Sequence, residues 1–148
     1  MQTNLDLRTK IEYLWNNNSE LINKESQNVI IETLGLLDNG TLRVAEFQDG
    51  SWKVNDWLKK AVLLSFKISD NKHIEAGDLN FYDKVANKFL GYTSDKFKDL
   101  KTRVVPPATV RFGSHVGRNT VLMPSFVNIG AYVGNGTMVD TWATVGSC

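Results

Sequence analysis

A single carboxylate stands out in the C-terminal stretch, where charged side chains are otherwise almost absent. Between Val110 and Cys148 the other charged residues are Arg111 and Arg118. Asp140 directly follows a valine of a sequence repeat, and at two equivalent places the valine is followed by glycine, Gly134 and Gly146. An outward-facing carboxylate on a rigid scaffold can accept or orient a proton. A solvated turn residue is the simpler interpretation of Asp140, and the pattern alone favours it.

Histidine and cysteine are too few to suggest a metal centre. Zinc enzymes of the carbonic anhydrase type that are built on repeats of this kind need several converging histidines, and here only His115 lies on the repeat. His73 lies in a segment that is typical of a turn, so we expect an exposed residue rather than a ligand. Cys148 is the only cysteine, which excludes an internal disulfide and a cysteine-rich zinc site. We expect no metal.

The repeat that must position Asp140 has a period of six. Aliphatic residues recur in one phase at Val121, Val127, Val133, Val139 and Val145, with small residues four places on, and upstream the phase differs by one, at Val110, Val116 and Leu122. A period of six fits a parallel β-helix in which three hexads make one triangular coil. Val121 and Val139 are then expected in one interior column. A β-sandwich rich in valine is the alternative.

Composition favours an ordinary soluble chain. The 148 residues carry a net charge of +1 and are 42% hydrophobic. There is no basic stripe that would favour nucleic acid, and no apolar run that could span a bilayer or form a signal peptide. We therefore expect a cytoplasmic protein without nucleic-acid or membrane partners.

The first hundred residues predict a mixed helical domain. Apolar residues at helical spacing predict helices over 3–17, 26–37 and 56–66, the last capped by Asn55. Leu42 to Val54 predicts a hairpin with an Asp49-Gly50 turn, and Ser94 with Asp95 could cap a short helix that reaches Leu100. The segment from Ser69 to Lys101 is otherwise less regular. Pro106 and Pro107 indicate an extended linker, so we divide the chain into residues 1–102 and 103–148.

Several segments together resemble tetrahydrodipicolinate N-succinyltransferase. In the repeat they are Arg103–Ala108, Asn119–Ser125, Val127–Val133 and Gly136–Cys148, and in the first domain Leu42–Glu46 and Trp57–Phe66. The resemblance implies an α+β N-terminal domain followed by a left-handed parallel β-helix. It also implies a homotrimer that acts in the diaminopimelate route to lysine, where it transfers succinyl from succinyl-CoA to the amine of the ring-opened substrate and gives N-succinyl-2-amino-6-oxopimelate.

The resemblance also implies roles for two residues. Asp140 matches the family's acidic residue at the substrate site, and Arg103 matches its substrate-binding arginine. A carboxylate near the nitrogen suits an amine that must lose a proton before it attacks a thioester, and an arginine fork suits a substrate with two carboxylates. Arg111 and Arg118 could reach a substrate carboxylate or a CoA phosphate, or could simply be surface charges, and we leave them out of the site.

Members of this family continue beyond the point that corresponds to Cys148. Their second active-site acid, a glutamate, and most coenzyme contacts lie in that further part. We therefore interpret the chain as the N-terminal portion of a longer enzyme, with about two coils of the β-helix, and expect it to be inactive alone. The alternative is a non-catalytic structural or trimerising β-solenoid module. In either case we expect residues 1–148 alone to be poorly soluble or oligomeric.

Overall fold

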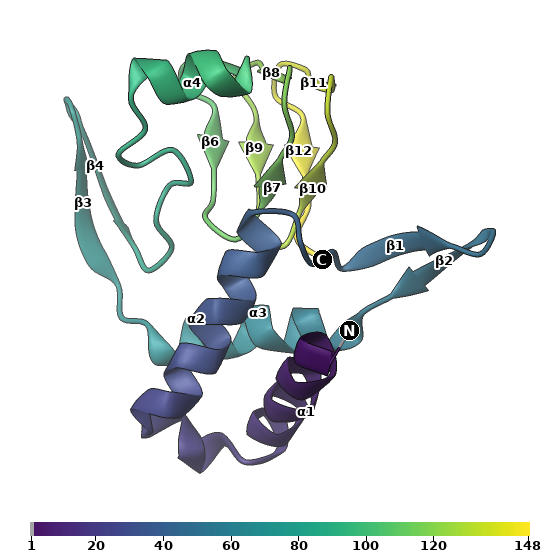
Figure 1. The fold of residues 1–148 in the computed structure, drawn as a ribbon. Helices are drawn as coiled ribbons and strands as arrows, with labels where there is room; N and C mark the ends of the chain where they lie inside the picture. The colour runs from purple at the N-terminus through teal and green to yellow at the C-terminus, as the bar shows by residue number, and fades with distance from the viewer. Residues whose placement is uncertain (1) are drawn as a thin grey trace.

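The structure is a computed structural model that describes residues 2–148 (Figure 1). Its first part is built from helices α1 (Gln2–Asn16), α2 (Lys24–Asp38) and α3 (Asp56–Ile68), with the short 3-10 helix η1 (Asn18–Ile22) between α1 and α2. These helices confirm the three predicted spans to within a few residues. No helix in the described part of the chain is both long and apolar enough to cross a membrane.

The three helices pack against one another through the apolar residues whose helical spacing predicted them. The helices contribute to this core the buried residues Leu7, Ile11 and Leu14 of α1, Ile30, Leu34 and Leu37 of α2, and Trp57, Leu58, Ala61, Val62 and Leu64 of α3, and Leu21, Leu42, Val44 and Ile129 complete it. Most of the stability of short helices comes from packing of this kind rather than from intrinsic propensity. The three helices share one core and lie below the coil in the view of Figure 1.

Asn55 does not cap α3 in the predicted way. Its side chain makes no capping hydrogen bond. Nδ2 donates instead to the carbonyl oxygen of Arg43 and to Oε1 of Glu46, each at 2.8 Å. The residue thus ties the start of α3 to the preceding hairpin, an arrangement that local sequence rules do not reveal.

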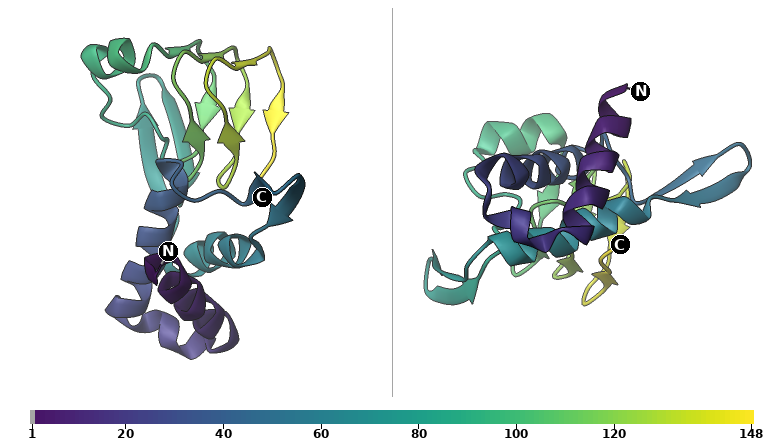
Figure 2. Two further views of the ribbon diagram at one scale, coloured as in Figure 1. Left: turned by 45° about the vertical axis from the view of Figure 1, so that its right-hand side comes forward. Right: turned by 90° about the horizontal axis from the view of Figure 1, so that it is seen from below.

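Two hairpins project from opposite sides of the molecule (Figures 1 and 2). The predicted one consists of β1 (Ala45–Gln48) and β2 (Ser51–Val54), and both turn residues, Asp49 and Gly50, have positive φ. The other, β3 (Lys72–Ala76) with β4 (Leu79–Asp83), was not predicted. His73 lies in β3 rather than in a turn, although it is exposed as expected. Helix α4 (Ser94–Leu100) follows, capped by Thr93 instead of Ser94 or Asp95.

The C-terminal part is a left-handed parallel β-helix with three faces. One face contains β5 (Arg103–Val104), β8 (Val121–Leu122) and β11 (Met138–Val139), and the second contains β6 (Thr109–Val110), β9 (Phe126–Val127) and β12 (Thr144–Val145). The third pairs β7 (His115–Val116) with β10 (Tyr132–Val133). Strands β5 to β7 form one coil, β8 to β10 the next, and β11 and β12 begin another. This confirms the predicted fold class.

The phase of the repeat changes one residue later than the sequence suggests. Leu122, not Val121, pairs with Val139, and Leu122 is fully buried whereas Val121 is only partly so. The interior residues Leu122 and Val127 are therefore five apart instead of six. The prediction that Val121 and Val139 share an interior column was therefore wrong. The adjacent aliphatic residues Val121 and Leu122 fit the repeat equally well, and only the shortened corner after Leu122 decides which of them faces the interior.

A buried ion pair joins the end of α2 to the coil. The Lys88 ammonium lies 2.8 Å from Oδ2 of Asp38 and donates to the Asp38 carbonyl oxygen at 2.9 Å. The other carboxylate oxygen of Asp38 accepts from the backbone N–H of Gly113 at 2.9 Å, and the N–H of Lys88 donates to the carbonyl of Val110. Because the Lys88 side chain is only 6% exposed, this junction fixes the helices against the coil.

Candidate functional site

The candidate site lies on the outer surface of the β5–β8–β11 sheet, which we call the site face. This face is on the side of the coil away from α1, α2 and α3 (Figure 1). Side chains alternate between the interior and the surface along a strand, and the register aligns Arg103, Val121 and Met138 in one outward column. Asp140 lies two residues after Met138, just beyond β11, and therefore also faces outward. Its side chain is exposed.

Asp140 is held by the backbone of its own turn. The N–H of Thr141 donates to Oδ1 of Asp140 at 2.7 Å, and the N–H of Ala143 donates to the Asp140 carbonyl oxygen at 3.1 Å. Within the described chain Oδ2 accepts no hydrogen bond. One carboxylate oxygen is thus anchored while the other is available to a ligand, which suits an acceptor of a proton or of an N–H bond.

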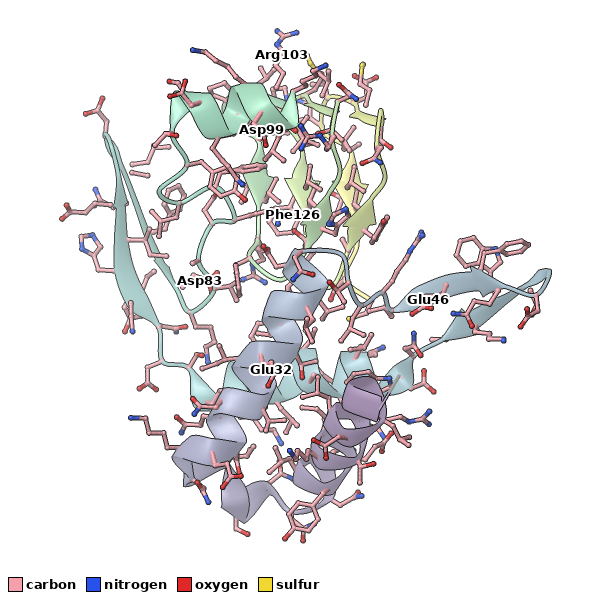
Figure 3. The ribbon with its side chains drawn as sticks, viewed as in Figure 1. Glu32, Glu46, Asp83, Asp99, Arg103 and Phe126 are labelled. Carbon is pink, nitrogen blue, oxygen red and sulfur yellow. The ribbon has the colours of Figure 1, made fainter. Side chains whose placement is uncertain are left out.

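Arg103 opens the first strand of the same face. Its backbone N–H donates to the carbonyl of Thr120 at 3.0 Å, which fixes the residue to the coil. Figure 3 shows its side chain at the top of the view, beside α4. No carboxylate among the described residues forms an ion pair with this guanidinium. The fork is therefore open to an anionic group from outside.

The two predicted site residues share a face but do not touch. Arg103 and Asp140 are separated by two rungs of the sheet and by two residues along the strand direction. With rungs about 4.8 Å apart and a rise of about 3.3 Å per residue, their Cα atoms lie about 12 Å apart. A ligand that engages both side chains in one chain must therefore be extended between them.

Exposed apolar side chains accompany the two charged residues. Met138 is 59% exposed and Trp142 is 77% exposed. Trp142 lies outside the coil, whose narrow interior has no room for an indole. The surface exposure of Met138 was not predicted. Because alternate residues of a strand face the same side, its position two residues before the outward-facing Asp140 is the one sequence signal that could have indicated this exposure.

The other two arginines of the coil form contacts within the chain. Arg111 lies 2.6 Å from Oδ2 of Asp83 at the end of β4 and donates to Oδ1 of Asn128. Partial burial acts to raise the pKa of Asp83, but the hydrogen bond and charge of Arg111, together with backbone hydrogen bonds from Lys84 and Val85, hold that pKa below its usual range. Arg118 pairs with Asp99 of α4. Both cations thus attach neighbouring elements to the coil.

His115 packs in an aromatic stack. Its ring centroid lies 4.5 Å from that of Tyr132, and the Arg43 guanidinium covers the Tyr132 ring at 4.0 Å. Burial lowers the pKa of His115, and the nearby cations Lys88 and Arg43 lower it further. Among the side chains that the structure describes, no group of three or more His, Cys, Asp or Glu is placed to hold a metal ion.

Known proteins match both parts of the chain. A family model described as tetrahydrodipicolinate N-succinyltransferase N-terminal matches residues 6–68. Proteins named 2,3,4,5-tetrahydropyridine-2,6-dicarboxylate N-succinyltransferase are similar over longer ranges. The one from Acinetobacter baylyi is 62% identical over 117 residues, which is 79% of this chain and 43% of the relative. The one from Dechloromonas aromatica is 54% identical over 145 residues, 96% of this chain and 53% of the relative.

A less similar relative of the same name matches a slightly larger share of both chains. The protein of the same name from Caulobacter vibrioides is 48% identical over 151 aligned positions, which cover 97% of this chain and 55% of the relative. The chain thus spans about half the length of the curated relatives it matches. By sequence and fold, the chain is similar to the N-terminal portion of members of the tetrahydrodipicolinate N-succinyltransferase family.

Proposed function

We propose that the chain acts, as part of a longer polypeptide, in transfer of succinyl from succinyl-CoA to the amine of ring-opened tetrahydrodipicolinate. The product is N-succinyl-2-amino-6-oxopimelate, on the diaminopimelate route to lysine. The names of the relatives support the reaction. The observation that carries the proposal for this chain is Asp140, an exposed carboxylate with one oxygen anchored and the other available on the site face.

Asp140 is the proposed proton acceptor. The substrate amine must be neutral to attack, and a carboxylate beside it can take up the proton that the nitrogen loses. A C–N bond then forms at the thioester carbon, the C–S bond breaks, and CoA leaves as the thiolate, which takes up a proton. The hydrogen bond from the Thr141 N–H keeps the carboxylate in one orientation through these steps.

Arg103 is the proposed anchor for a carboxylate of the acyl acceptor. A guanidinium binds a carboxylate through two parallel hydrogen bonds, which fixes orientation as well as charge. The separation of about 12 Å from Asp140 places this anchor away from the reacting nitrogen. Arg103 therefore contributes to binding and orientation, and Asp140 to the chemical step.

Further parts of the proposal concern the whole protein. We propose a cytoplasmic homotrimer, a division of this chain into residues 1–102 and 103–148, and no transfer activity for residues 1–148 alone. The beginning of the coil at Arg103 and the apolar exposure of Met138 on the site face support the division and the self-association.

The test begins with the native mass of the intact protein and its succinyl-CoA-dependent transfer activity. Asp140→Asn in the full-length protein should lower kcat by about 10²-fold to 10⁴-fold, the range for loss of a general base. Asp70→Asn, an exposed loop residue, is the matched control and should leave kcat unchanged. Arg103→Lys should raise KM for the acyl acceptor, because an ammonium cannot form the two-pronged contact.

Two results would overturn the proposal. A rate for Asp140→Asn within twofold of wild type would remove Asp140 from the chemistry. A native protein that ends at Cys148 and transfers no succinyl group would instead favour the non-catalytic solenoid module.

A further inference from the structure

Five corners of the coil share a backbone conformation that is unusual for most residues. At each of these corners one residue has positive φ and directly precedes a small residue at the turn. The residues and their φ angles are Gly113 (85°), Asn119 (55°), Gly130 (83°), Gly136 (70°) and Trp142 (59°). Glycine and asparagine are the residue types that tolerate this left-handed region. Trp142 is the exception within the described coil.

The conformation of Trp142 is fixed by its hydrogen bonds. Its N–H donates to the carbonyl of Pro124 on the preceding coil at 2.6 Å, and the Ala143 N–H closes the turn onto the carbonyl of Asp140. The backbone therefore cannot relax out of the left-handed region without breaking a rung of the coil. A bulky side chain at such a position is a genuine outlier, and outliers of this kind concentrate at functional sites.

Packing within the chain does not compensate for this strain. The Trp142 side chain is 77% exposed. By contrast Trp52, also exposed, stacks edge-on against Phe47 with 5.5 Å between ring centroids. No aromatic or cation–π partner for Trp142 exists among the described residues. The exposed indole is therefore available for contact with a molecule outside this chain.

We propose that the Trp142 indole forms an apolar wall over the hydrocarbon chain of the acyl acceptor bound at Asp140. The inference rests on the proposed function and extends it to a binding residue. Trp142 belongs to the same four-residue turn as Asp140, so the substrate nitrogen and the indole meet at one corner of the coil. An indole over the substrate's methylene groups adds apolar contact and keeps water from the carboxylate beside the amine.

The test compares variants of Trp142 in the full-length protein. Trp142→Gly and Trp142→Asn introduce the residue types found at the other corners, and Trp142→Phe keeps a flat apolar ring. Steady-state kinetics give kcat and KM for both substrates, calorimetry gives the unfolding midpoint, and light scattering gives the oligomeric state. Because Gly and Asn relieve the strain, these two variants should unfold at the same temperature as wild type or above it.

The expected kinetic change is specific to one substrate. Trp142→Gly and Trp142→Asn should raise KM for the acyl acceptor about tenfold or more while KM for succinyl-CoA stays within twofold, and Trp142→Phe should retain most of the affinity. A lower unfolding midpoint with loss of assembly would overturn the inference and assign the indole to contact with a second copy. If the wild type is active and the variants have unchanged kinetics, the inference about Trp142 is overturned but the proposed function stands. If the wild type itself is inactive, both the proposed function and the inference are overturned.

Discussion

The ion pair between Lys88 and Asp38 gives the sharpest stability prediction. The two side chains are 6% and 18% exposed. Removal of one partner from a buried pair leaves an uncompensated charge and typically costs about 3–5 kcal/mol, whereas replacement of both partners is often nearly neutral. We expect Asp38→Asn to lower the free energy of unfolding by about 3 kcal/mol, out of a total that is about 5–15 kcal/mol for a typical domain.

Further variants distinguish the interaction energy of Lys88 with Asp38 from the contribution of the other contacts that each residue makes. Lys88→Met should cost less, about 1.5 kcal/mol, because Asp38 is more exposed and keeps the hydrogen bond from Gly113. The double variant should also lose only about 1.5 kcal/mol, which makes the two changes non-additive by about 3 kcal/mol. Lys98→Met with Asp95→Asn is the matched control, since that pair is 77% and 93% exposed. Its coupling should stay below about 0.5 kcal/mol.

Urea unfolding followed by tryptophan fluorescence measures these differences. Trp57 lies in the helical core and reports on its loss. Protein concentration must be the same for all variants, because self-association adds to apparent stability. If the losses for Asp38→Asn and Lys88→Met add to within about 0.5 kcal/mol in the double variant, the pair does not act as a unit and the reasoning fails.

The phase of the repeat and the burial of His115 give two more predictions. Leu122→Ala should cost about 2–5 kcal/mol and Val121→Ala about 1 kcal/mol or less in urea unfolding, since only Leu122 is fully buried; equal costs would contradict the observed register. The pKa of His115 is lowered in the folded chain by burial, so the unfolded state binds the proton more readily, and stability should fall as pH drops through about 6.5, the ordinary pKa of histidine. His115→Phe should weaken that decline in thermal unfolding at pH 7.5 and 5.5, and an identical decline would assign it to other groups.

Local patterns in the sequence were enough for elements that bury one face. The helices, the Asp49-Gly50 hairpin and the six-residue repeat were predicted because their apolar residues follow the period of the structure. The β3–β4 hairpin was missed because its residues are exposed on both faces, so no alternation marks it. The register error at Val121 has a different origin, because two neighbouring aliphatic residues make the phase ambiguous until the pairing of strands is known.

The candidate site was only partly accessible from the sequence. Asp140 stood out as the one carboxylate of the repeat, whereas its role and Arg103 came from the resemblance. Whether the two residues share a face depends on the register of the coil, which local patterns cannot give. The contact between Asp38 and Lys88 joins residues 50 positions apart, so no spacing rule could predict it. The strain at Trp142 became visible only when φ could be compared from corner to corner.

The shortened corner between Leu122 and Val127 bears on how the family can change in evolution. A single-residue insertion there would restore the six-residue spacing within the corner loop, outside the paired strands. The same insertion within β11 would exchange inward and outward side chains and turn Asp140 toward the interior. Among homologues, length differences of one residue should therefore gather at corners of this kind, and an alignment that forces a fixed period across Leu122 would compare the wrong positions on one side of it.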